Sequence, residues 1–396
     1  MTAKRLLKLV RWTALVSAVL FAVLGPAFGA RLSLPSCSPL IALCASLGAP
    51  GAAGWTVAVG LVLLLVIAWR VRWFCRWVCP VGLMLDGCHR VCPRPRRIPK
   101  LRPGPVGIWL FLLTVGGAGL GYPLFAWLDP LALLSGTASV WRSGWGLAAI
   151  AAALGIPLLL LLEWLQPRLW CGRLCPLGGM QDFLALWQRR FWKARGAQEG
   201  GAPKPAPGFG RRPVLGVLGG LATVWAGRAL GWAGNSRVVR PPGAAGKEKF
   251  TGLCVRCGSC MAACPSKILR PDSGTAGWSG MFAPIADFST DYCREDCARC
   301  VNVCPSGALA RLSQEKKRQW KMGIAELDLG LCVLASGGEC TACITHCPYA
   351  ALSVGSSDDG FGSQPILQKE LCVGCGACEA FCPAQPRRAI VVKSEA

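Results

Sequence analysis

Residues 254–265 read CVRCGSCMAACP, and residues 372–383 read CVGCGACEAFCP. Both fit the spacing C-x2-C-x2-C-x3-C-P, which holds [4Fe–4S] clusters in bacterial ferredoxins. Residues 293–305 (CREDCARCVNVCP) and 332–348 keep the C-x2-C-x3-C-P ending but have longer first gaps. Because each cluster takes four thiolates, the four groups predict four [4Fe–4S] clusters. The sixteen predicted ligands are Cys254, Cys257, Cys260, Cys264, Cys293, Cys297, Cys300, Cys304, Cys332, Cys340, Cys343, Cys347, Cys372, Cys375, Cys378 and Cys382.

Two other uses of cysteine are common in cysteine-rich chains. Small secreted domains join cysteines in disulfides, and structural zinc sites use paired C-x-x-C knuckles. Neither use explains why four groups end in the same Cys-Pro pattern. In two-cluster ferredoxins the fourth cysteine of a group ligates the other cluster. Two pairings are open: first group with second and third with fourth, or first with fourth and second with third.

The charge of the chain is unevenly distributed. The 396 residues are 53% hydrophobic and carry a formal net charge of +23. Residues 1–239 hold 26 basic and 5 acidic side chains, whereas residues 240–396 hold 17 and 15. The positive excess lies between hydrophobic segments, as the positive-inside rule places it in membrane proteins. We therefore expect a lipid bilayer rather than a nucleic acid as the partner of the first half.

Four apolar segments in the first half predict membrane-spanning helices. They run from Trp12 to about Phe28, over 54–69, over about 105–121 and over about 146–165. Segments 70–104 and 166–212 each hold nine Lys or Arg, whereas the two opposite loops hold only Arg31 and Arg142. This asymmetry predicts a cytoplasmic N-terminus.

The first half also repeats itself. FCRWVCPVGLMLD at 74–86 recurs as WCGRLCPLGGMQD at 170–182, and SPLIAL at 38–43 recurs as DPLALL at 129–134. Two copies of a helix pair in the same orientation predict a pseudo-two-fold axis along the membrane normal. The two C-x3-C-P loops are then expected at equivalent places on the cytoplasmic face, and the SPLIAL and DPLALL segments in outer loops.

The duplicated loops supply four cysteines, Cys75, Cys79, Cys171 and Cys175. They can ligate one cluster between the repeats, act as redox-active thiols, or simply pack. Cys88 and Cys92 form a third C-x3-C-P without a counterpart, and can complete a local set with the first loop instead. Cys37 and Cys44, in the first outer loop, are candidates for a disulfide if that side is oxidising.

The chain divides into four parts. Residues 1–194 are expected to form an all-α membrane domain of four helices in two tandem repeats, and residues 195–210 a flexible linker rich in Gly, Pro and Ala. Residues 211–234 begin with Arg-Arg, resemble a twin-arginine signal and predict a fifth, anchoring helix. Residues 235–396 are then a periplasmic α+β ferredoxin domain. Apolar segments such as 351–354 and 389–392 predict short strands of two β-α-β-β-α-β units there.

Two families share these patterns. The half with two C-x3-C-P loops resembles NapH/MauN-type membrane proteins, and the part from Arg211 onward resembles NapG/MauM-type periplasmic polyferredoxins. The latter resemblance rests on TGLCVRCGSCMAACPSKILRPD (251–272), DYCREDCARCVNVCPSGAL (291–309) and CTACITHCPYAALSV (340–354). The chain thus resembles a fusion of the two subunits. The resemblance implies a bacterial inner-membrane protein of a quinol dehydrogenase type system, with nitrate reductase the named acceptor.

Other carriers have little support in the sequence. The chain has only two histidines, His89 and His346, and no C-x-x-C-H, so no haem is expected. Oxidation of quinol releases protons, and Asp86, Asp182 and Glu163 are candidate acceptors near the cytoplasmic interface. Interfacial carboxylates beside many arginines commonly form ion pairs instead.

The sequence predicts transfer of electrons from membrane quinol to a periplasmic redox enzyme or cytochrome. Two alternatives belong to other classes. The chain can serve as a maturation or assembly factor for a periplasmic redox enzyme, lending clusters or thiols to it. It can also transfer electrons in reverse, from a periplasmic dehydrogenase to quinone.

Overall fold

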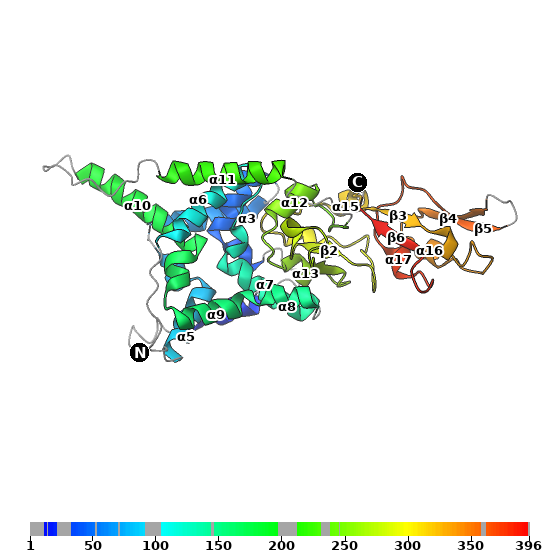
Figure 1. Cartoon of the computed structure of the whole chain (residues 1–396), viewed down its shortest axis with the longest axis horizontal. Helices are drawn as coiled ribbons and strands as arrows, with labels where there is room; N and C mark the ends of the chain where they lie inside the picture. Colours follow the sequence, from blue (N-terminus) through cyan, green and yellow to red (C-terminus); the bar gives the residue numbers. More distant parts are fainter. Residues whose placement is uncertain are drawn as a thin grey trace.

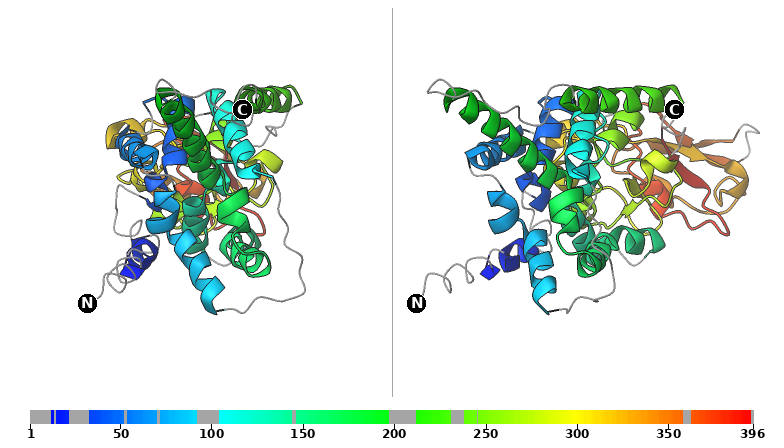
Figure 2. Two further views of the ribbon diagram at one scale, coloured as in Figure 1. Left: turned by 90° about the vertical axis from the view of Figure 1, so that its left-hand side faces the viewer. Right: turned by 60° about the vertical axis from the view of Figure 1, so that its left-hand side comes forward.

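The computed structural model has a helical part followed by a ferredoxin part, arranged end to end (Figure 1). It describes residues 12–13, 15–21, 33–51, 54–69, 72–91, 104–143, 146–196, 212–230, 238–244, 246–357 and 362–394. The right-hand view of Figure 2 shows the same order, with the strands of the last third at the end away from the N-terminus. Most of the expected linker, Arg211 and Cys92 lie outside the described residues.

The helical part holds the two repeats and the helix after them. Its elements are η1 (Leu34–Cys37), α2 (Pro39–Gly48), α3 (Gly54–Trp69), α4 (Trp73–Trp77), α5 (Pro80–Val91), α6 (Val106–Gly119), η2 (Ala126–Leu128), α7 (Pro130–Ser143), α8 (Leu147–Ala153), α9 (Gly155–Leu165), η3 (Trp170–Leu174), α10 (Pro176–Gly196) and α11 (Arg212–Ala229). Residues 12–13 and 15–21, from the first expected span, are helical.

One helical stretch of the described residues, Leu147–Leu165 across α8 and α9, is long and apolar enough to cross a membrane. Helix α3 has 16 residues and α6 has 14, fewer than the ~20 that a bilayer core needs. Within the residues that the structure describes, the four spans expected from hydropathy are therefore not all present at full length. The described residues of the N-terminal part form helices, few of which are long and apolar.

The segments expected as outer loops are instead the first turns of two buried helices, α2 and α7. Each begins with a residue that caps a helix, followed by proline, which suits the first helical position. The hydroxyl of Ser38 accepts a hydrogen bond from the Ile41 amide, and Oδ1 of Asp129 accepts one from the Leu131 amide. Neither segment contains Lys or Arg, which is why both were expected in outer loops, whereas their Ser-Pro and Asp-Pro pairs indicate the start of a helix.

Helix α11 belongs to the helical part, since it packs along α6 with the two backbones in close contact. A Cβ atom on Gly220 of α11 would lie 2.2 Å from the carbonyl oxygen of Leu113. One on Gly116 of α6 would lie 2.1 Å from the carbonyl oxygen of Val217. Such small-residue contacts are typical of helix pairs in membranes.

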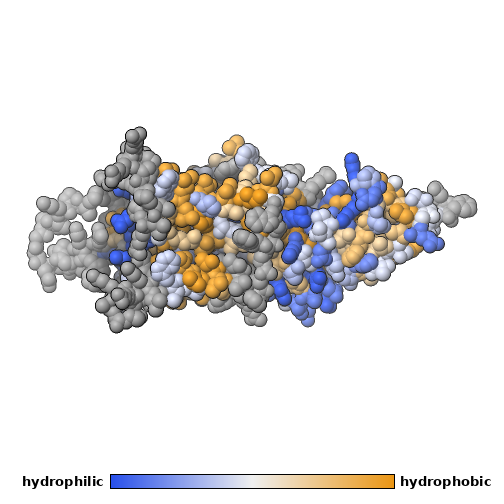
Figure 3. Space-filling view, turned by 90° about the horizontal axis from the view of Figure 1, so that it is seen from below, coloured by the Kyte–Doolittle hydropathy of each residue, from blue (hydrophilic) through white to orange (hydrophobic). Residues whose placement is uncertain are grey.

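The face of the helical part seen in Figure 3 is largely apolar, and polar residues gather on the same face over the beginning of the ferredoxin part. Large apolar side chains point outward from α3, α9 and α11. Trp69 is 87% exposed, Trp225 71% and Leu65 69%. Exposed apolar surface of this extent marks a membrane or protein contact.

The ferredoxin part consists of short helices and strands. They are α12 (Lys247–Leu253), α13 (Ser259–Ala263), β1 (Leu269–Pro271), η5 (Trp278–Gly280), β2 (Pro284–Ala286), α14 (Arg299–Asn302), α15 (Gln314–Arg318), β3 (Ile324–Leu327), η6 (Leu329–Leu331), α16 (Ala342–Thr345), β4 (Leu352–Ser356), β5 (Ser363–Leu367), α17 (Ala377–Ala380) and β6 (Ile390–Lys393). The strands form three antiparallel pairs, β1–β2, β3–β6 and β4–β5.

The expected β-α-β-β-α-β order is present in the second unit, as β3, α16, β4, β5, α17 and β6. The strands predicted at 351–354 and 389–392 correspond to β4 and β6. The first unit has the same order around α13, β1, β2 and α14, but its outer strand pair is reduced to one bridge, Ala244 with Leu309.

The first ferredoxin unit is seated on helix α7 of the helical part. Helix α13 packs on α7, and the hydroxyls of Ser135 and Ser259 lie 3.2 Å apart. Ile41 and Ala132 of the helical part form one buried apolar cluster with Val255 and Cys257. The two parts therefore meet through buried side chains.

Candidate redox centres

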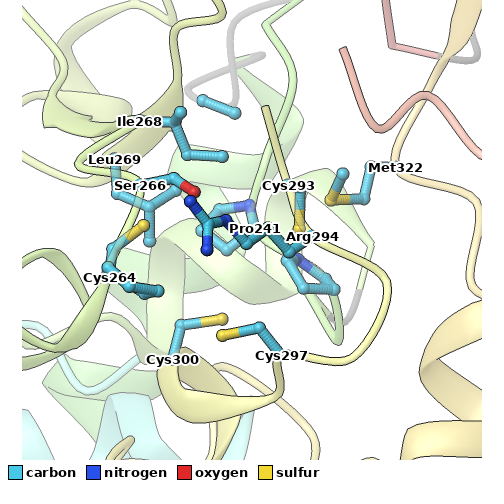
Figure 4. A pocket seen from close by; sticks show the side chains of 13 residues that line it. Pro241, Cys264, Ser266, Ile268, Leu269, Cys293, Arg294, Cys297, Cys300 and Met322 are labelled. Carbon is cyan, nitrogen blue, oxygen red and sulfur yellow. The ribbon is translucent and has the colours of Figure 1, made fainter. Parts of the chain in front are cut away.

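The first ferredoxin unit brings eight of the predicted ligands around two cavities. One cavity is lined by Cys254, Cys257, Cys260 and Cys304, here called tetrad 1. The other is lined by Cys264, Cys293, Cys297 and Cys300, here called tetrad 2. Figure 4 shows tetrad 2 with its cysteines around a common space. The first and second groups thus exchange their fourth cysteines, which is the sequential pairing.

Burial of these thiols fits ligation by iron. Burial raises the pKa of Cys257 to about 12. It also raises the pKa of Cys260, to which the nearby thiols Cys257, Cys254 and Cys304 add. A buried thiolate is unfavourable without a positive charge beside it, and a bound metal supplies that charge. The donor set and the cavities therefore fit iron–sulfur clusters.

The second unit repeats this arrangement. Burial raises the pKa of Cys343 to about 11, and Cys332, Cys340 and Cys382 add to the rise. These four form tetrad 3. Burial likewise raises the pKa of Cys378, with contributions from Cys375, Cys372 and Cys347, which form tetrad 4 with it. The third group is therefore paired with the fourth.

The spacing within the tetrads matters for the choice of metal. Among the described residues, no group of three or more His, Cys, Asp or Glu side chains is arranged to hold a single metal ion. A cubane takes one thiolate on each of four irons, so its ligands stand farther apart than those around one zinc ion. All sixteen cysteines are free thiols, and none is in a disulfide.

The helical part contains a fifth set of four cysteines. Cys75 and Cys171 lie on α4 and η3, and Cys79 and Cys175 directly precede α5 and α10. Burial raises the pKa of Cys79 and of Cys175, and for both the next contributions come from Cys75 and Cys171. We call this set the inner tetrad. The structure groups cysteines from both repeats, rather than Cys75 and Cys79 with Cys88.

The two loops of the inner tetrad have the same backbone. Arg72 and Arg168, each three residues before its first cysteine, adopt the left-handed conformation with φ of 57° and 61°. The duplicated glycines are explained as well. A Cβ atom on Gly82 would lie 2.6 Å from the Cys75 carbonyl oxygen, and one on Gly178 would lie 2.8 Å from that of Cys171.

Sequence reasoning missed Gln181. This side chain is fully buried, and its Nε2 donates a hydrogen bond of 2.9 Å to Sγ of Cys75 in the other repeat. The sequence does mark this position, because Gln181 departs from the repeat: the aligned residue in the first copy is Leu85.

The three candidate proton acceptors lie near this tetrad in different settings. Asp182 is held by Arg72 through two hydrogen bonds of 2.6 Å, which balance its charge. Glu163 is buried, and its Oε1 accepts a hydrogen bond of 2.6 Å from the Arg168 amide. Asp86 is exposed. Burial raises the pKa of Cys171 to about 12, and the negative charges of Glu163 and Asp86 contribute to this rise.

The remaining residues of interest have other partners. Cys37 and Cys44 are free thiols in η1 and α2, so no disulfide joins them. His346 follows α16. Its ring stacks on that of Phe381, with the ring centroids 3.8 Å apart, and its Nδ1 donates a hydrogen bond to the Ala342 carbonyl oxygen. These contacts give His346 a packing role.

Comparisons with known proteins match both parts of the chain. Two 4Fe-4S dicluster domain models match residues 253–308 and 338–386. The second range leaves out Cys332, which the structure nonetheless brings to tetrad 3. A 4Fe-4S binding domain model matches residues 51–99 and 145–195, which contain the two C-x3-C-P loops.

Several ferredoxin-type proteins are similar in sequence. The ferredoxin-type protein NapG of Escherichia coli (strain K12) is 35% identical over 196 residues, which are 45% of this chain and 83% of NapG. The methylamine utilization ferredoxin-type protein MauM of Methylobacillus flagellatus is 34% identical, over 37% of this chain and 64% of MauM. NapF of Escherichia coli (strain K12) is 31% identical, over 38% of this chain and 84% of NapF. No solved structure matches the chain significantly. With its cysteine tetrads and these similarities, the chain belongs to the family of NapG-type 4Fe–4S ferredoxins, which are iron–sulfur electron-transfer proteins.

Proposed function

We propose that the chain is a membrane-anchored electron carrier that passes electrons from membrane quinol to a periplasmic reductase, of the nitrate-reductase type or related. Five iron–sulfur centres, at the inner tetrad and tetrads 1 to 4, form its path. The observation that carries this proposal is that the helices that hold or adjoin the tetrads follow one another along the molecule, from α5 and α10 in the helical part through α13 to α17 and α16 in the ferredoxin part (Figure 1). When bound, a [4Fe–4S] cluster supplies a one-electron carrier at each tetrad.

The order within the ferredoxin part follows from contacts. Tetrads 1 and 2 share the first unit, where helix α13 packs on α14. Tetrads 2 and 4 are joined across the units, because the amide of Cys293 donates a hydrogen bond of 2.8 Å to the Cys375 carbonyl oxygen. Tetrad 3 lies beyond tetrad 4 in the second unit, where α16, which carries Cys343 of tetrad 3, packs on α17, which carries Cys378 of tetrad 4. The path therefore runs through tetrads 1, 2, 4 and 3.

The step between the two parts is supported by buried contacts. Cys257 of tetrad 1 packs in one apolar cluster with Ile41 and Ala132, near the starts of α2 and α7. Helices α5 and α10, which begin directly after Cys79 and Cys175 of the inner tetrad, pack on α7 and α2. Helices α2 and α7 thus connect the inner tetrad with tetrad 1. This arrangement supports an electron path from the inner tetrad to tetrad 1 through the packed side chains of these helices.

Membrane attachment is supported by two observations. Large apolar side chains of α3, α9 and α11 are exposed, and the face of the helical part that Figure 3 shows is largely apolar. The eighteen Lys and Arg of segments 70–104 and 166–212 flank the C-x3-C-P loops. By the positive-inside rule, these charges support a cytoplasmic side for the inner tetrad and a periplasmic side for the ferredoxin part in a bacterial inner membrane.

The ferredoxin end farthest from the helical part offers the contact for the partner. Cys340 and Cys343 of tetrad 3 are only partly buried. The nearby side chains Leu329 and Val333 are 41% and 37% exposed. A redox protein that docks on this end brings its own centre close to tetrad 3.

An equilibrium titration of the purified full-length chain in detergent tests the proposal. We expect about 20 iron atoms per chain, five clusters of four. Added quinol should reduce clusters detected by EPR. Reduction by quinol and poor reoxidation by quinone support the stated direction, whereas efficient reduction of quinone by the reduced chain favours reverse flow. A chain whose clusters respond to neither is not a quinol-linked carrier, which leaves the maturation role.

A further inference from the structure

The two copies of the inner-tetrad segment differ in polarity at two buried positions. The repeat aligns Phe74 with Trp170 and Leu85 with Gln181. All four side chains are at least 94% buried, with exposures of 0%, 6%, 2% and 0% in that order. The first repeat therefore has two apolar side chains where the second repeat has two side chains that carry N–H groups. The thiols, the glycines and the left-handed arginines are the same in both.

Packing alone does not account for these polar groups. Gln181 Nε2 donates to Cys75 Sγ, while its Oε1 has no hydrogen-bond partner among the described residues. The indole Nε1 of Trp170 is buried and likewise has no hydrogen-bond partner there. Buried polar groups without partners cost free energy and are rare in folded proteins. An apolar residue fits each position, as the first repeat shows.

A sulfur-rich group at the inner tetrad would use these donors. Thiolates and inorganic sulfides accept hydrogen bonds, and an indole N–H is a donor only. Trp170 directly precedes Cys171 and lies in the same buried cluster as Cys79 and Cys175. Gln181 already donates to a thiol of the tetrad.

We propose that Gln181 and Trp170 are positioning residues that donate N–H···S hydrogen bonds to the cluster at the inner tetrad and raise its reduction potential. This inference rests on the proposed function, which places a cluster there. Reduction adds negative charge to a cluster, and hydrogen bonds to its sulfurs stabilise the reduced state. A raised potential suits the centre that first takes electrons from quinol, which is a weak reductant. The asymmetry places both donors on the second repeat.

Replacing each donor by the residue of the first repeat tests this inference. The variants Gln181→Leu and Trp170→Phe introduce side chains that already fit at the aligned positions. The readout is an EPR-monitored redox titration of the full-length chain. The signal of the inner tetrad is identified as the one that Cys75→Ser removes.

We expect the midpoint potential of the inner tetrad to fall in each variant and to fall further in the double variant. The four ferredoxin clusters should keep their potentials. Gln188→Leu is the matched control, because it makes the same chemical change two turns farther along α10, and it should shift nothing. An unchanged potential in Gln181→Leu and Trp170→Phe, with full iron content, overturns the inference and leaves both side chains a packing role.

A second variant covers the case in which Gln181→Leu does not bind iron. From the symmetry of the repeat we expect Leu85 to face the second loop as Gln181 faces the first, so Leu85→Gln should add a donor and raise the midpoint potential. A potential that stays the same or falls there contradicts the inference. The failure of the proposed function looks different: Cys75→Ser would then have the same iron content and EPR spectrum as the unmodified chain.

Discussion

Ser38 and Asp129 lie 91 residues apart in the chain, yet the Ser38 hydroxyl donates a hydrogen bond of 2.5 Å to Oδ2 of Asp129. Both side chains are fully buried. They occupy the same position in the two repeats, so the repeats meet at equivalent residues, as a pseudo-two-fold axis requires. Each residue also caps its own helix, and the pair therefore fixes the starts of α2 and α7 against each other.

Removal of this contact should destabilise the helical part. We expect Asp129→Ala to lower the free energy of unfolding by about 2–4 kcal/mol, because it removes a helix cap and leaves the buried Ser38 hydroxyl without its acceptor. Asp129→Asn keeps an acceptor and a cap, and should cost about 1 kcal/mol or less. Denaturant unfolding in detergent, followed by tryptophan fluorescence, measures both. Asp86→Ala, at an exposed position, is the control, and equal effects of the three changes would contradict the account.

The glycines of the C-x3-C-P loops should be necessary for iron at the inner tetrad. In Gly82→Ala the new Cβ atom would meet the Cys75 carbonyl oxygen at 2.6 Å, and backbone at that distance must move. We expect a loss of about four iron atoms per chain, with the ferredoxin clusters intact. Gly87→Ala lies on the same helix with nothing within 4 Å of the added atom, and should keep all its iron. Equal iron content in the two variants would show that the loop tolerates the side chain.

The exchange of fourth cysteines gives a prediction for single substitutions. Cys304→Ser should remove or convert the cluster that also uses Cys254, and leave the one that uses Cys297 unchanged. Separate EPR titrations of Cys304→Ser and Cys254→Ser should then lose the same signal. If Cys304→Ser instead loses the signal that Cys297→Ser loses, each group binds its own cluster and the exchange is wrong.

Asp182 should contribute little to quinol oxidation. Its ion pair with Arg72 is partly exposed, with the two side chains 30% and 46% accessible, so it should be worth at most about 1 kcal/mol. We expect quinol to reduce the clusters of the Asp182→Asn and Arg72→Ala variants at rates within about twofold of the rate in the unmodified chain. Rapid mixing with quinol over a range of pH measures this. A rate that falls tenfold in Asp182→Asn alone, with a shifted pH profile, would make Asp182 a proton acceptor after all.

Much of the structure of the ferredoxin part could be predicted from the sequence, and less of the structure of the helical part. Cysteine spacing predicts the ligands because the chemistry of a cubane acts through a short loop, as around Cys254. The pairing of groups depends on contacts across space, such as Cys293 with Cys375, which no local pattern contains. Hydropathy detected apolar segments but not that α2 and α7 are buried helices, because charge counts ignore capping residues such as Ser38. Gln181 was not predicted because comparison of the two repeats selects the residues that they share, and Gln181 differs from its counterpart.

The central claim is that electrons pass along the tetrads in one order. Cys297→Ser, which interrupts the path at tetrad 2, tests it most directly when the full-length chain is mixed rapidly with quinol and followed by freeze-quench EPR. The account predicts that the inner tetrad and tetrad 1 are reduced as in the unmodified chain while tetrads 3 and 4 stay oxidised, although dithionite still reduces them. Reduction of tetrads 3 and 4 at the unmodified rate would contradict it.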